Sequence, residues 1–174
     1  AFRVAYAKNV IDEAECRQLI SELSGIPSKG QKCVDDQTQY QKVASKLMSA
    51  DSLLYIGRGL DYALSMEGSL KIKEISYIHS ESYAAGELKH GTISLIEDGM
   101  PVIAVATQHA LYEKTMSNIK EVKTRGATVI MVYSEDMKFD ENDVDYPVTL
   151  PLARDLLMPL VAVVPLQLIA YYTA

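Results

Sequence analysis

The sequence predicts an α/β fold, in which a parallel sheet is flanked by helices on both faces as a three-layer sandwich. Three short runs, at residues 52–56, 100–106 and 128–133, are apolar without interruption. Continuous rather than alternating apolar residues are typical of strands that are buried on both faces. Helix-like segments separate these runs, and strands that alternate with helices form parallel sheets through right-handed crossovers.

The first 50 residues are predicted to form N-terminal helices. Apolar residues recur at helical spacing over residues 1–24, and Gly25 followed by Pro27 is typical of a helix stop. A second helix is expected from about Gln31 to Met48.

Residues 51–150 are predicted to form the βα core. The strand Ser52–Ile56 ends in the turn Gly57-Arg58-Gly59, and Asp61 is placed to cap a helix that runs to about Ile78. The elements expected after it are a strand over Met100–Ala106, a helix over His109–Arg125 ended by Gly126, a strand over Thr128–Tyr133, an acidic loop over Asp136–Asp145 and a short strand over Tyr146–Leu150.

Residues 151–174 are predicted to supply the C-terminal helix, from about Ala153. Its apolar part, Leu156–Ala174, is long enough to approach the thickness of a bilayer. However, Pro159 and Pro165 interrupt it, no basic flank orients it, and a βαβ domain needs an apolar helix to cover its sheet. We therefore expect a sheet-covering helix and no membrane partner.

The composition fits one domain and restricts its partners. The chain has 174 residues, with 17 Lys and Arg against 23 Asp and Glu, so its net charge of −6 argues against nucleic acid as a partner. Cys16 and Cys33 lack the spacing of a redox or metal motif, so we expect idle thiols, no metal, no cofactor and a cytoplasmic location. The chain begins without Met and ends without a cap signal, so a fragment of a larger chain is expected.

The Gly57-Arg58-Gly59 turn invites a dinucleotide-binding interpretation. Tyr62 stands where the third glycine of that fingerprint belongs, so a tight strand-to-helix turn without a ligand is favoured.

The helix after this turn carries Glu67, Lys71 and Glu74 at a spacing that places them on one stripe. Such a stripe is either a solvated ladder of ion pairs or a catalytic group. Leu70, Ile72, Ile75 and Ile78 are expected to leave little open surface around it, and a carboxylate in such surroundings gains the raised pKa of a general base.

His90 is the best histidine candidate, because it lies in a stretch between Gly86 and Gly91 that lacks strong periodicity and also holds an acid and a lysine. His79 and His109 are interpreted as structural or idle.

A long run of residues closely resembles the glutamine:fructose-6-phosphate amidotransferases. The run comprises Glu67-Gly68-Ser69-Leu70-Lys71-Ile72-Lys73-Glu74-Ile75-Ser76-Tyr77-Ile78-His79, Glu81 and Tyr83-Ala84-Ala85-Gly86-Glu87-Leu88-Lys89-His90-Gly91, with Met100-Pro101-Val102-Ile103 and Val164-Pro165-Leu166-Gln167-Leu168 further on. The resemblance covers residues 52–174 strongly and the N-terminal helices only loosely.

The resemblance implies a sugar-isomerase (SIS) fold, Rossmann-like, in which two such subdomains form the isomerase half of the enzyme. This chain looks like the second, and its partners would be fructose 6-phosphate or glucosamine 6-phosphate, the first subdomain and glutaminase domain of the same parent chain, and a second copy in a homodimer. In that family the position matching Glu74 moves a proton between C1 and C2 of the open-chain sugar, and the position matching His90 assists ring opening. Lys71 and Glu67 match supporting positions.

Departures from the family are also visible. Thr92 stands where proline usually follows the His-Gly pair. The glutaminase domain, the Ser/Thr-rich phosphate loop of the first subdomain and the C-terminal tail with its substrate lysine are absent, so the chain is expected to hold half of a site. Three alternatives stay open: a sugar-phosphate sensor module, a fructosamine-phosphate deglycase, and a structural subdomain that only supplies a dimer face.

Overall fold

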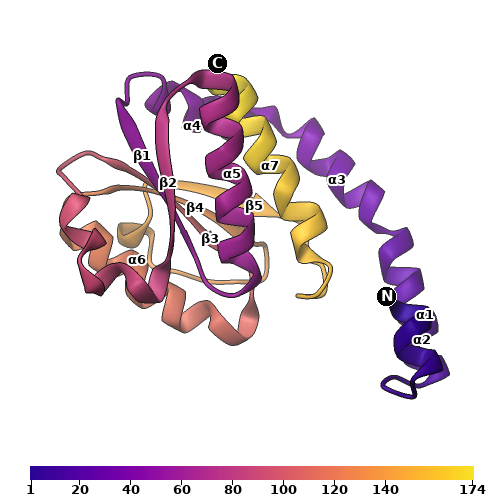
Figure 1. Cartoon of the computed structure of the whole chain (residues 1–174). Helices are drawn as coiled ribbons and strands as arrows, with labels where there is room; N and C mark the ends of the chain where they lie inside the picture. The colour runs from indigo at the N-terminus through magenta and orange to yellow at the C-terminus, as the bar shows by residue number, and fades with distance from the viewer.

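A computed structural model describes residues 1–174 as a five-stranded sheet between two layers of helices (Figure 1). The strands lie in the order β2-β1-β3-β4-β5, and every neighbouring pair is parallel. They are β1 (Ser52–Gly57), β2 (His79–Ala84), β3 (Pro101–Ala106), β4 (Thr128–Ser134) and β5 (Tyr146–Leu150). The predicted α/β sandwich with a parallel sheet is therefore confirmed.

The helices divide between the two faces of this sheet. One face is covered by α4, α5 and α7, and the opposite face by α6 together with the short 3-10 helix η1. The helices are α1 (Phe2–Ala7), α2 (Glu13–Ser24), α3 (Ile26–Asp35), α4 (Gln37–Leu47), α5 (Leu60–Ser76), α6 (Tyr112–Thr124) and α7 (Met158–Thr173), with the 3-10 helices η1 (Ala85–His90), η2 (Thr92–Leu95), η3 (His109–Leu111) and η4 (Glu141–Asp143). In Figure 1, α5 and α7 lie side by side on the sheet, while α3 leads away from it to α1 and α2.

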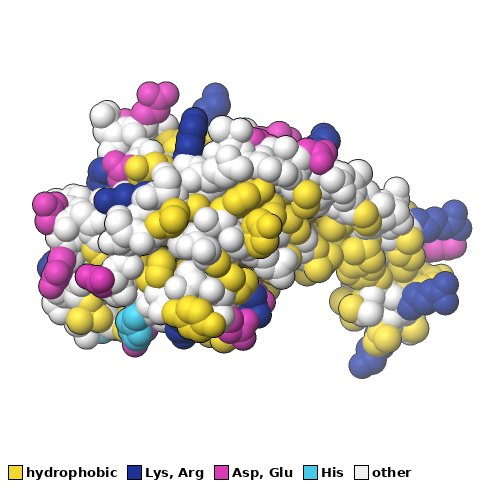
Figure 2. All heavy atoms as spheres, turned by 90° about the horizontal axis from the view of Figure 1, so that it is seen from above, with side chains coloured by type: hydrophobic (Ala, Val, Ile, Leu, Met, Phe, Trp, Pro, Cys, Tyr) yellow, Lys and Arg dark blue, Asp and Glu magenta, His cyan; other side chains and the backbone are white.

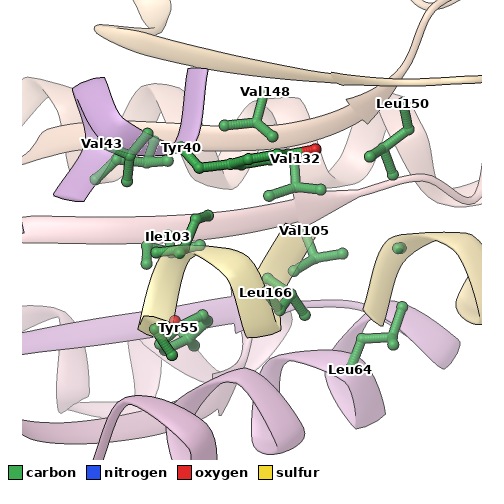
Figure 3. Packing of buried hydrophobic residues seen from close by; sticks show 14 of the residues in the cluster. Tyr40, Val43, Tyr55, Leu64, Ile103, Val105, Val132, Val148, Leu150 and Leu166 are labelled. Carbon is green, nitrogen blue, oxygen red and sulfur yellow. The ribbon is translucent and has the colours of Figure 1, made fainter. Parts of the chain in front are cut away.

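The two faces explain the uninterrupted apolar strands. Along β1, Leu53 and Tyr55 join the core under α5 and α7, whereas Leu54 and Ile56 join the core under α6. Figure 3 shows the first of these cores, where Tyr55 lies close to Leu166 of α7. Each large side chain buried in this way contributes roughly 1.5–3 kcal/mol to folding.

Gly68 explains how closely α5 approaches the sheet. A Cβ at this position would lie 2.7 Å from Cε1 of Tyr55, so any larger residue would push the helix outward. The close packing of α5 against β1 therefore requires a glycine at position 68.

The two predicted N-terminal helices are in fact four, although the helix end predicted at Gly25 is confirmed, because α2 ends at Ser24. Asn9 adopts a left-handed backbone (φ 53°), which breaks the first helix, and α2 starts afresh where the Asp12 side chain accepts a hydrogen bond from the Glu15 N–H at 2.7 Å. Gly25, the predicted stop, has a helical φ of −83°, so α3 begins directly at Ile26.

Three other bounds differ. The helix expected to reach Ile78 ends at Ser76, because Tyr77 turns left-handed (φ 63°), and the next residues form β2, a strand that the sequence did not predict. The helix expected from His109 begins at Tyr112 after a 3-10 turn. α7 begins at Met158 rather than Ala153, and no helix has both the length and the apolar character needed to cross a membrane.

Candidate active site

The charged stripe lies on the outer side of α5. This helix starts at the carboxyl end of β1 and runs back to the opposite edge of the sheet, because β2 begins three residues after it. Leu64, Gly68 and Ile72 face the sheet and are buried. Glu67, Lys71 and Glu74 lie beside this buried row, from the middle of the helix toward its carboxyl end.

The three side chains form one ion group, as the sequence predicted. Lys71 Nζ lies 2.6 Å from Glu74 Oε2 and 3.7 Å from Glu67 Oε1. The hydrogen bond to Glu74 raises the pKa of Lys71, and the charge of Glu67 acts in the same direction. Lys71 is consequently a fixed cation next to a carboxyl group, an arrangement that can stabilise a developing oxyanion while the carboxyl group moves a proton.

The expected apolar enclosure of Glu74 is not present. The Glu74 side chain is 49% exposed, and both Leu70 and Ile75 are exposed as well, so only Ile72 of the four flanking residues is buried. Leu70 and Glu74 lie two residues before and two residues after buried Ile72, and helical spacing points such side chains away from the buried row. A low-dielectric environment for Glu74 must therefore come from outside this chain.

His90 lies at the end of η1 and points away from the core. Ala85 and Leu88 of this short helix are fully buried against the α6 side of the sheet, whereas the His90 side chain is 73% exposed. Its Nδ1 lies 2.7 Å from Glu87 Oε2, and Gly91 follows with a φ of 133°. Thr92, the departure from the family pattern, begins η2.

Glu74 and His90 are not brought together within one chain. Leu64 and Ile72 of α5 belong to the core on one face of the sheet, while Ala85 and Leu88 of η1 belong to the core on the other. The sheet lies between them, and a helix packs about 10 Å from its neighbouring layer. One small sugar cannot contact both residues of the same chain.

The glycine turn after β1 is closely packed, as expected of a tight strand-to-helix turn. A Cβ on Gly57 would lie 2.5 Å from the backbone of Asp61, and Gly59 has a φ of 56°. The prediction that Asp61 caps α5 was wrong. Its carboxylate is 1% exposed and accepts hydrogen bonds from Thr107 N (2.7 Å), Thr107 Oγ1 (2.6 Å) and Gln108 N (3.2 Å), so it ties the turn after β1 to the turn after β3.

The other two histidines are part of ion pairs. His109 Nε2 lies 2.8 Å from Asp136 Oδ2, and its Nδ1 is hydrogen-bonded to Asp155. These two partners, Asp136 first, raise the pKa of His109. His79 Nε2 lies 3.8 Å from Glu81 Oε1. Both histidines fit the predicted structural interpretation.

Sequence reasoning passed over Arg58 as the middle of a glycine turn. Its side chain donates two hydrogen bonds to Asn118 on α6 and lies beside the backbone of Gly86 in η1. No periodicity or motif signals this contact, because the three segments are distant in sequence.

No three His, Cys, Asp or Glu side chains are grouped so that they could hold a metal ion.

Comparison with known proteins gives consistent matches. The SIS domain family matches residues 46–174. Glutamine–fructose-6-phosphate aminotransferase (isomerizing) of Clostridium tetani is 47% identical over 174 residues, which are all of this chain and 29% of that protein. The enzyme of the same name from Caldanaerobacter subterraneus is 49% identical over 174 residues, with the same two coverages. The chain therefore spans less than a third of the length of these relatives.

Among solved structures, the C-terminal domain of glucosamine-fructose-6-phosphate aminotransferase from Francisella tularensis superposes with a TM-score of 0.91 at 33% identity. The match covers 99% of this chain and 48% of that one, so about half of that domain has no counterpart here.

Proposed function

This chain belongs to the SIS domain family, and on that premise we propose that it is the second sugar-isomerase subdomain of a glucosamine-6-phosphate synthase. The parent enzyme would convert fructose 6-phosphate and glutamine-derived ammonia to glucosamine 6-phosphate, a step toward UDP-N-acetylglucosamine. The relatives named above support this assignment, because they match the chain over its whole length. The proposed chemistry rests on one observation: Lys71 contacts both Glu67 and Glu74 on the solvent-facing part of α5.

The isomerisation requires a carboxylate that removes a proton next to a carbonyl and returns it to the neighbouring carbon. We assign this role to Glu74. Lys71, held at 2.6 Å from Glu74 and protonated, would stabilise the enediolate oxygen, and Glu67 would hold Lys71 in place from its other side. No cofactor is needed for this step.

The site is completed by other parts of the assembly. Glu74 is half exposed and faces out of the domain, so the first subdomain of the parent chain would cover it and supply the phosphate contacts. Exposed apolar side chains near the N-terminus, among them Val4, Tyr6 and Val10, offer further surface for the rest of the parent chain. Figure 2 shows apolar side chains gathered on the part of the molecule that extends away from the main body.

His90 would act in a different site from Glu74 of the same chain. The two residues lie on opposite faces of the sheet, so in a symmetric homodimer each site would combine Glu74 of one chain with His90 of the other. His90 would then donate a proton to the ring oxygen of the sugar bound by the partner.

The main alternative functions make less use of these residues. A sugar-phosphate sensor requires recognition but no base, so it has no need of both Glu74 and His90. A structural subdomain needs neither. A fructosamine-phosphate deglycase shares the fold and part of the motif, but the long run from Glu67 to Gly91 favours the synthase.

Two free, buried cysteines, Cys16 and Cys33, are consistent with a cytoplasmic enzyme.

The function is tested with the full-length parent protein, incubated with fructose 6-phosphate and glutamine and analysed for glucosamine 6-phosphate. The synthase assignment predicts product. Binding of fructose 6-phosphate without turnover would instead identify a sensor, and fructose 6-phosphate release from a fructosamine phosphate would identify a deglycase.

A further inference from the structure

We propose that Arg58 and Asn118 are positioning residues that hold η1 in place and thereby present His90 to the sugar ring. The proposal deepens the proposed function and rests on it, because it acts through His90. It also assigns a role to the residue in the middle of the glycine turn.

Arg58 is directed by the two glycines around it. Gly57 must lack a Cβ because the backbone of Asp61 would lie 2.5 Å from it, and Gly59 adopts a φ of 56° that favours glycine. The turn is thus fixed, and it places the Arg58 guanidinium against η1. A Cβ on Gly86 would lie 3.1 Å from both terminal nitrogens of Arg58, so the backbone of η1 rests on this group.

Asn118 fixes the guanidinium from the side of α6. Its Oδ1 accepts hydrogen bonds from Arg58 Nε at 3.1 Å and from Nη2 at 2.9 Å, and the residue is only 5% exposed. A buried amide that lost these donors would be left with an unsatisfied oxygen, which costs about 1–3 kcal/mol. This pair is therefore a stronger constraint than an ion pair at the surface.

The contacts continue from Asn118 to the residue before His90. Asn118 Nδ2 donates to Glu121 Oε2 at 3.4 Å, and Glu121 Oε1 lies 2.9 Å from Lys89 Nζ. Lys89 itself is 66% exposed, so this last contact is the weaker end of the chain of contacts.

η1 depends on these contacts because it has little rigidity of its own. It is one short 3-10 helix, whose hydrogen bonds are poorly aligned, and Gly91 beyond it has no atom within 4 Å of its Cβ position. Buried Ala85 and Leu88 anchor one side of η1. Arg58 and Asn118 hold the other side, so their loss would let His90 shift relative to the partner's sugar.

The expected consequence is specific to ring opening. In that step the C2–O5 bond of the cyclic sugar breaks, O5 receives a proton from His90, and the anomeric hydroxyl loses its proton as C2 becomes a carbonyl. 5-Deoxyfructose 6-phosphate has no 5-hydroxyl and cannot close this ring, so it enters the reaction already open. Misplacement of His90 should therefore impair turnover of fructose 6-phosphate and spare the deoxy substrate.

The experiment compares kcat/KM for these two substrates in the full-length parent enzyme. Asn118→Leu keeps the approximate size of the side chain and removes the oxygen that accepts both Arg58 hydrogen bonds, so it should lower kcat/KM for fructose 6-phosphate by about tenfold or more, while the value for the deoxy substrate changes less than about twofold. The Asn118→Asp, Glu121→Gln double variant keeps an acceptor for Arg58 at position 118 and a hydrogen-bonding amide at position 121, and should retain most of the wild-type value. Arg58→Lys keeps the charge but loses the paired donors, and should show the same substrate selectivity as Asn118→Leu.

Lys120→Ala is the matched control, because Lys120 lies on the same helix and its ion pair with Asp143 is remote from η1. It should leave both values unchanged. Equal losses on both substrates by Asn118→Leu and Arg58→Lys would overturn the proposal, as would no loss at all or an Asn118→Asp, Glu121→Gln variant as impaired as Asn118→Leu.

Failure of the proposed function is distinguishable from failure of this inference. A wild-type parent that aminates neither substrate refutes the synthase assignment. A wild-type parent that is active, with a His90→Asn variant that spares the deoxy substrate but an Asn118→Leu variant that does not, refutes only the positioning role.

Discussion

The separation of Glu74 and His90 by the sheet leads to a complementation test. Full-length chains carrying Glu74→Gln and chains carrying His90→Asn are co-expressed with different affinity tags, and the heterodimers are isolated by two successive purifications. If each site combines Glu74 of one chain with His90 of the other, a heterodimer has one site with both lesions and one site wholly intact.

The expected activities follow from the number of intact sites in each dimer. Each mutant homodimer has a lesion in both sites and should lose about 10²-fold or more, the usual contribution of a positioned acid or base. The isolated heterodimer should regain about half of the wild-type activity per dimer, if the two sites act independently. An unfractionated mixture that assembles at random is half heterodimer and should reach about a quarter of wild-type activity.

The assay is glucosamine 6-phosphate formation at saturating fructose 6-phosphate and glutamine. A heterodimer of two differently tagged Glu74→Gln chains is the control for tag and purification effects, and should stay inactive. The reasoning is refuted if the Glu74→Gln, His90→Asn heterodimer is no more active than the mutant homodimers. Glu74 and His90 would then act within one chain, or His90 would not be catalytic.

Three other experiments probe Glu74, the completeness of the site and the ion group at His109. In the full-length enzyme, Glu74→Gln keeps the shape of the side chain and removes its basicity, so kcat should fall by about 10²-fold or more with the fold unchanged by circular dichroism; an unchanged kcat would make Glu74 an ordinary helix-surface acid. The isolated 174-residue chain should form no glucosamine 6-phosphate, because the proposed assignment places the phosphate contacts and the tail lysine in other parts of the parent chain, and measurable product would contradict this. Since Asp136 and Asp155 raise the pKa of His109 above its usual 6.5, the stability it contributes is full below that value and is lost as pH rises through the folded-state pKa. The Tm of the chain should therefore fall more steeply above pH 6.5 than that of a His109→Asn variant, and parallel curves would show that the ion group adds no stability.

The sequence identified the central strands because each is buried on both faces. Leu53 to Ile56 and Val102 to Ala106 have no polar residue, since α5 and α7 cover one side and α6 the other. β2 was missed for the opposite reason. It is an edge strand of composition His-Ser-Glu-Ser-Tyr-Ala, with only Ser80 buried, and that hydroxyl is satisfied by the Ser69 side chain at 2.7 Å. No hydrophobic period marks such a strand.

The charged stripe on α5 was predictable because helical spacing alone places Glu67, Lys71 and Glu74 together. The enclosure of Glu74 was not, since the exposure of Leu70 and Ile75 depends on which side of α5 faces the sheet. The pairing of Arg58 with Asn118 joins residues 60 positions apart in sequence, and only the folded topology brings them together.

The role of Asp61 decides where the substrate phosphate can bind. In an open parallel sheet, ligands bind outside the carboxyl ends of the strands at the point where the strand order reverses, which here lies between β1 and β3. In this chain the Asp61 carboxylate already accepts the N–H groups of Thr107 and Gln108 and the Thr107 hydroxyl at that point. A phosphate would need the same donors and would meet a buried acidic group, whose pKa is raised by its burial. Phosphate binding at this position would therefore require Asp61 to leave, which supports our proposal that another subdomain holds the phosphate of a sugar placed at Glu74.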